Sequence, residues 1–241
     1  MATALYGGHS SVVLDAPVSE RVAYLRKLGV LTFASLGITA TAAVLAMGAV
    51  LSIDALRSNI VSLIVMLGGI YGAQGISHTV MRSGSQGARV AGFVAASALQ
   101  GVAISYLLLT AVMLSMNLYA SPFVFLGQAG ALVALTVLGM VLYLLSGPKQ
   151  LSMVGSMLSM LTLPMLGLMA ITWIFPVGGI FGVLISAGFV VVSAGGLLYS
   201  LNTVMHHFRT DMVLAGALHV SIGIVVLFWN LLVLLMRLQR R

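Results

Sequence analysis

The stretch "ISAGFVVVSAGGLLYSLNTVMH", from Ile185 to His206, decides the class of this protein. It is apolar along almost its whole length, and a helix of about 20 such residues crosses a lipid bilayer. Its apolar residues run continuously instead of alternating, which indicates a membrane helix and not a strand of a barrel. Ser200 and Asn202 form a polar step near its end, which raises the question of a working site.

Seven stretches of the chain, this one included, are long and apolar enough to span a membrane. They are, approximately, Leu28–Leu51, Asn59–Met81, Val90–Leu114, Pro122–Ser146, Leu151–Phe175, Gly178–Leu201 and Val213–Met236. Hydrophobic residues make up 61% of the chain and charged residues only 6%, whereas soluble domains carry roughly 25% charged residues. The sequence therefore predicts an all-α integral membrane protein with seven transmembrane helices.

The expected domain organisation is equally simple. Residues 1–20 are mixed in character and predict a disordered N-terminal tail, and residues 21–241 form one seven-helix transmembrane domain. With the N-terminus in the cytoplasm, seven Lys and Arg residues fall in inside loops and four fall outside, which favours this orientation. These basic residues are scattered at segment ends and form no basic stripe, so nucleic acid is not an expected partner, whereas the lipid bilayer is.

Chemistry that needs carboxylates or thiolates inside the membrane is poorly supported. The four acidic residues, Asp15, Glu20, Asp54 and Asp211, lie in the tail or in loops, and the chain has no cysteine. Proton relays and hard-cation sites in membranes usually use buried carboxylates. We therefore expect no catalytic residue, no metal site and no cofactor, and we expect that the protein is not an enzyme.

Several uncharged or weakly basic polar residues remain as candidates for a pH-sensitive or polar core. His219 lies inside the last apolar stretch, where it needs a partner, and Asn202 and His206 lie just after the sixth stretch, in the loop that follows it. Amides and hydroxyls inside the stretches are expected to be interhelical hydrogen-bonding groups, with a polar permeation path as the alternative. These groups are Gln74, Gln100, Gln128, Ser200, Ser221 and Asn230.

Several segments resemble the Bax inhibitor-1-like family of membrane proteins. They are "YLLSGPKQLSMVGSML" (Tyr143–Leu158), the stretch from Ile185 to His206, "ALHVSIG" (Ala217–Gly223) and the basic-apolar start of the first helix from Glu20 onward. The resemblance implies six helices around a central seventh. It also implies a position for the two acids that form a pH-sensitive latch in ion-leaking members. Those positions fall on Ser200 and Ser221, and serine cannot ionise or compensate the charge of calcium.

The resemblance also supplies the functional expectation. Other bacterial members lack the paired acids, and some of them are partners of a membrane AAA+ protease of the FtsH type. The expected protein is thus a multi-pass protein of the bacterial inner membrane that modulates such a protease. The first alternative is a leak for protons or cations such as calcium, tuned by His219, with the acidic latch replaced by serines. The second alternative is an unrelated permease for small solutes.

Overall fold

A computed structural model describes residues 12–52, 59–82, 85–145 and 179–239, and every regular element in these ranges is helical. The predicted stretch Leu151–Phe175 lies outside the described residues. The elements are the 3-10 helix η1 (Val13–Asp15) and the α-helices α1 (Val18–Ser52), α2 (Asn59–Arg82), α3 (Gln86–Tyr119), α4 (Val124–Leu145), α6 (Gly179–His207) and α7 (Val213–Gln239). In the described part, α1, α3, α4, α6 and α7 are long and apolar enough to cross a membrane.

The helices extend beyond the predicted apolar stretches at several ends. The first helix begins at Val18 instead of Leu28, because its charged first turns continue the helix past the apolar run. Its 35 residues span about 52 Å, more than the roughly 30 Å of a hydrocarbon core. The third helix begins at Gln86 instead of Val90, and the hydroxyl of the preceding residue, Ser85, accepts the Ala88 N–H at 3.2 Å and caps the first turn.

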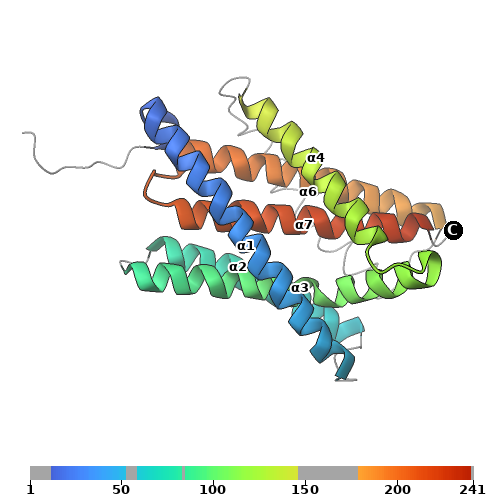
Figure 1. Ribbon diagram of the computed structural model, residues 1–241. Helices are drawn as coiled ribbons and strands as arrows, with labels where there is room; N and C mark the ends of the chain where they lie inside the picture. Colours follow the sequence, from blue (N-terminus) through green and yellow to red (C-terminus); the bar gives the residue numbers. More distant parts are fainter. Residues whose placement is uncertain (1–11, 53–58, 83–84, 146–178, 240–241) are drawn as a thin grey trace, which may run out of the picture.

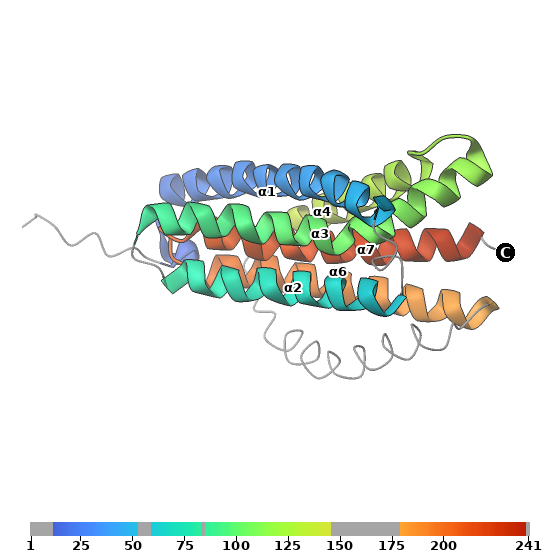
Figure 2. The same ribbon diagram turned by 90° about the horizontal axis from the view of Figure 1, so that it is seen from below.

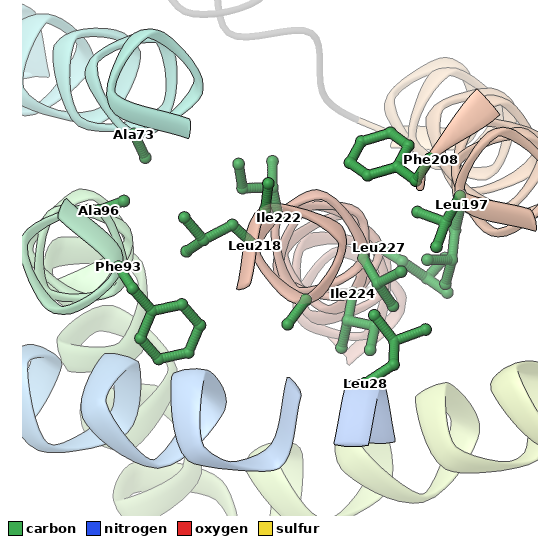
Figure 3. Close-up of a cluster of buried hydrophobic side chains, with 14 of the residues drawn as sticks. Leu28, Ala73, Phe93, Ala96, Leu197, Phe208, Leu218, Ile222, Ile224 and Leu227 are labelled. Carbon is green, nitrogen blue, oxygen red and sulfur yellow. The ribbon is translucent and has the colours of Figure 1, made fainter. Parts of the chain in front are cut away.

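Helix α7 lies in the middle of the described helices and contacts α1, α2, α3, α4 and α6 (Figures 1 and 2). Figure 3 shows its side chains reaching in several directions: Leu218 toward α2 and α3, Ile224 toward Leu28 of α1, and Leu227 toward Leu197 of α6. More of its residues are buried than in any other described helix. A sequence that is apolar nearly all round suits this position, because neighbouring helices cover several faces of α7. The predicted central place of the last helix agrees with these contacts.

The outer helices present large apolar side chains outward. Phe33 and Leu45 of α1, Leu135 of α4 and Val191 of α6 are each at least 66% exposed. Water-soluble monomers rarely expose so many large apolar side chains together, whereas lipid tails are themselves apolar and can cover them. The described helices therefore form a multi-pass bundle that contacts a bilayer.

The N-terminal segment differs from the predicted disordered tail over residues 12–20. Val13 is fully buried, its N–H donates to the Phe208 carbonyl at 3.0 Å, and Val12 forms an isolated antiparallel bridge with Arg209. The sequence did not predict this contact, because the tail is mixed in composition. Val13 nevertheless packs against the turn between α6 and α7. Burial of Val13 thus fixes the start of α1 to that turn.

Glycine permits very close packing between α1 and α3. A Cβ atom added to Gly101 of α3 would fall on the Thr39 carbonyl oxygen and lie 2.8 Å from both Ala42 Cβ and Ala43 N. Gly69 of α2 approaches α3 in a similar way, since an added Cβ would lie 2.7 Å from Ala103 Cβ. Small residues drive helix association in membranes because they let backbones approach.

We predict that Gly101→Ala lowers the melting temperature of the protein in detergent, because overpacking costs about 1–3 kcal/mol when backbones cannot separate freely. Gly127→Ala on α4 is the matched control, since nothing lies within 4 Å of the added Cβ. Scanning fluorimetry of the two variants measures the difference. Equal melting temperatures for the two variants would contradict the packing described for α1 and α3.

Candidate functional site

Four buried polar side chains from three helices meet beside the central helix. The hydroxyls of Ser35 (α1) and Ser97 (α3) lie 2.7 Å apart, and the Ser35 hydroxyl lies 3.0 Å from that of Ser221 (α7). The Gln100 amide of α3 directs its Nε2 toward the Ser221 hydroxyl at 3.5 Å. All four residues are at most 1% exposed. We call this set, Ser35, Ser97, Gln100 and Ser221, the serine cluster.

Backbone carbonyls complete the surroundings of the serine cluster. The Ser97 hydroxyl lies 2.8 Å from the Phe93 carbonyl, and the Ser221 hydroxyl lies 3.0 Å from the Leu218 carbonyl. Thr39 donates its hydroxyl proton to the Ser97 carbonyl at 2.9 Å, which adds a second hydrogen bond between α1 and α3. Uncharged polar groups thus link α1, α3 and α7 at Ser221.

Helical spacing explains why these residues meet. Thr32, Ser35 and Thr39 are all buried and lie three or four residues apart, so they share the face of α1 that turns inward. Ser97 and Gln100 share a face of α3 with Gly101, which brings the two backbones close enough for hydroxyl contacts. The same packing of α1 against α3 therefore gives both the close backbone approach and the hydroxyl contacts.

The two serines at the predicted latch positions lie at the same height on neighbouring helices. Gly223 of α7 packs on Leu197 of α6, and Gly216 packs near Val204, so the two helices run antiparallel. In this register Ser200 lies opposite Val220, the residue next to Ser221. The structure describes no hydrogen bond between the two serines. Ser221 is fully buried and bonds toward α1 and α3, whereas Ser200 is only half-buried. Only Ser221 belongs to the serine cluster.

The other predicted polar residues lie nearer the end of the bundle where α7 begins. Asn202 is buried, and its backbone carbonyl lies 2.9 Å from Nδ1 of His206. The His219 ring stacks against Phe208 with centroids 5.8 Å apart and the planes tilted by 34°. Phe208 also accepts the Val13 N–H, so His219 adjoins the place where the N-terminal segment is held.

The sequence did not single out Ser35 or Ser97. Serines are common in apolar helices, and nothing in a single sequence shows that residues 62 positions apart touch. The available signal was the spacing of Ser35 and Thr39, which places two hydroxyls on one face of an apolar helix. Gln100 and Ser221 were weighed as interhelical hydrogen-bonding groups, and the structure brings them together. Gln74 and Gln128 lie exposed on the outer surface instead.

The chemical capacity of the serine cluster is limited to hydrogen bonding and coordination by neutral oxygen. No group of three or more His, Cys, Asp or Glu residues gathers in the described part of the chain. Hydroxyls and amides do not ionise at physiological pH, so the cluster holds no charge of its own. Divalent cations in proteins usually need carboxylate ligands, so the cluster is poorly suited to them.

The whole transmembrane part of the chain matches one protein family. The model of the family described as "Inhibitor of apoptosis-promoting Bax1" matches residues 21–241. The chain belongs to this Bax inhibitor-1 family. No curated protein and no solved structure matches it. The family match agrees with the resemblance seen in the sequence, and in this member Ser221 occupies a polar junction of α1, α3 and α7.

We predict that Ser221→Ala destabilises the bundle by roughly 1–2 kcal/mol, because it leaves the buried donors of Ser35 and Gln100 without their acceptor. Ser186→Ala is the matched control: Ser186 is also buried, but within the described ranges its hydroxyl bonds only the Gly182 carbonyl of its own helix. Such a bond adds little stability to a helix. The free energy of unfolding in mixed micelles checks the difference, and an equal effect of the two substitutions would refute it.

Proposed function

We propose that this Bax inhibitor-1 family protein is a non-enzymatic, seven-helix protein of the bacterial inner membrane. It acts through protein contacts, as a partner or modulator of a membrane AAA+ protease of the FtsH type. The observation that carries the proposal is the serine cluster: α7 is held at Ser221 by neutral hydrogen bonds to α1 and α3. A core of this kind favours a fixed scaffold over a charge-driven gate.

The choice of partner rests on analogy with family members that also lack the paired acids. The sequence resemblance assigns Ser200 and Ser221 to the positions of those acids. Without two carboxylates, the central helix has no pair that can share a proton or hold calcium. What remains is the apolar outer surface of the bundle, which suits contact with another membrane protein.

The proposed orientation places the N-terminus in the cytoplasm. Helices α1, α3 and α7 begin at the same end of the bundle (Figures 1 and 2). Five basic residues lie at or near that end: Arg21, Arg26, Lys27, Arg89 and Arg209. Basic residues near short loops favour the cytoplasmic side. The same end carries the N-terminal segment held by Val13, so a cytoplasmic protease would meet this segment.

We predict that an FtsH-type protease co-purifies with the affinity-tagged full chain after mild solubilisation of bacterial membranes. Adding the purified chain to the reconstituted protease should also change the degradation rate of a membrane substrate by at least about twofold, roughly 0.4 kcal/mol in activation free energy. An unrelated multi-pass protein at the same density is the control. Absence of both the complex and the rate change would refute the proposed partnership.

A leak for protons or cations is the alternative function. It is favoured by His219, an ionisable residue of the central helix that lies two positions from Ser221. A leak through the bundle would respond to a step in pH, because histidine titrates near neutral pH.

The two functions differ in liposomes loaded with dyes for pH and calcium. The proposed function predicts no flux above that of empty vesicles, at any pH between about 5 and 8, the range in which histidine changes its charge. The alternative predicts flux that changes after a pH step and falls with His219→Ala. His207→Ala is its matched control, since His207 is exposed at the end of α6. Flux lost only in the His219 variant would favour the leak over the partnership.

A further inference from the structure

The serine cluster has more acceptor contacts than hydroxyl protons. Four contacts each require a hydroxyl proton: Ser35 with Ser97, Ser35 with Ser221, Ser97 with the Phe93 carbonyl, and Ser221 with the Leu218 carbonyl. Three serines supply three protons. One of the four contacts therefore joins two oxygens with no proton between them. The cluster is rich in acceptors and benefits from a donor from outside.

The amide of Gln100 adds a second acceptor. Its Nε2 faces Ser221, and its Oε1 is buried with no donor among the described residues, in a side chain that is 1% exposed. Turning the amide over would only exchange an unpartnered acceptor for an unpartnered donor. Whichever way the amide is oriented, one of its two polar atoms is buried without a hydrogen-bond partner among the described residues, which costs about 1–3 kcal/mol.

These two observations point to a small molecule that donates hydrogen bonds. A divalent cation lacks a carboxylate here, and a monovalent cation would lose its hydration to a set of neutral oxygens with no countercharge in the cluster. Water donates twice, accepts twice and occupies polar interior sites with two to four partners. We propose that the serine cluster and the free end of the Gln100 amide bind one water molecule inside the bundle, between α1, α3 and α7.

This hydration site goes beyond the proposed function and would exist whichever partner the protein has. The water donates to Gln100 Oε1 and supplies a donor to the acceptor-rich serines. It links α3 to α7 where relatives are expected to place a carboxylate. Because water and its ligands are neutral, the link keeps its strength when the pH changes.

A structure of the full chain, determined at a resolution that shows ordered water, tests the site directly. We expect one density peak about 2.7–3.2 Å from Gln100 Oε1 and from at least one further polar atom of the cluster, which are hydrogen-bond distances. The peak should be lost in Gln100→Met and kept in Gln128→Met, whose exposed amide on α4 is the matched control. No peak in a map that shows other interior waters would overturn the proposal.

A salt titration distinguishes water from a cation. Melting temperatures are compared in sodium chloride, potassium chloride and choline chloride at equal ionic strength. The water site predicts that the three curves coincide, because no cation binds the folded state. A melting temperature that rises with sodium or potassium alone, and is insensitive to them in Gln100→Met, would show a cation site and overturn the proposal. If Gln100→Met does not fold, Ser97→Ala takes its place in both experiments.

Discussion

The hydrogen bond between Ser35 and Ser221 is the interaction on which the arrangement of the bundle depends. A helix surrounded by others must satisfy every polar group it carries, because neither lipid nor bulk water reaches it. The Ser221 hydroxyl bonds the Leu218 carbonyl of its own helix, and the close approach of α1 and α3 brings Ser35 and Gln100 to it as further partners. Gly101 permits that approach. The close packing at Gly101 and the hydrogen bonds of Ser221 are therefore both met by the same position of α7.

The neutral character of this junction differs from the pair of acids that the sequence resemblance assigns to ion-leaking members of the family. A buried carboxylate pair changes its interactions when it gains or loses a proton, and so couples the position of helices to pH. Ser221 holds α7 to α1 and α3 by hydrogen bonds between neutral groups, whereas Ser200 takes no part in the serine cluster. The serine cluster therefore adds no charge of its own to the core at physiological pH.

Sequence reasoning reached the helices but not the site. Long apolar runs predicted α1, α3, α4, α6 and α7 because membrane helices carry their signal locally. The charged start of α1 and the burial of Val13 were missed, because both depend on a neighbouring segment. The meeting of Ser35, Ser97 and Gln100 with Ser221 was out of reach for the same reason: contacts between distant helices leave no local pattern.

Cross-linking of two introduced cysteines tests the central claim most directly, since the chain contains no cysteine of its own. In Ser35→Cys combined with Ser221→Cys, the account predicts rapid disulfide formation in native membranes, because the native hydroxyls lie 3.0 Å apart. Thiol labelling with a maleimide polymer after mild oxidation measures it. Ser186→Cys combined with Ser221→Cys is expected to stay reduced. Free thiols in the first pair, or equal oxidation of both pairs, would contradict the central position of Ser221 between α1 and α3.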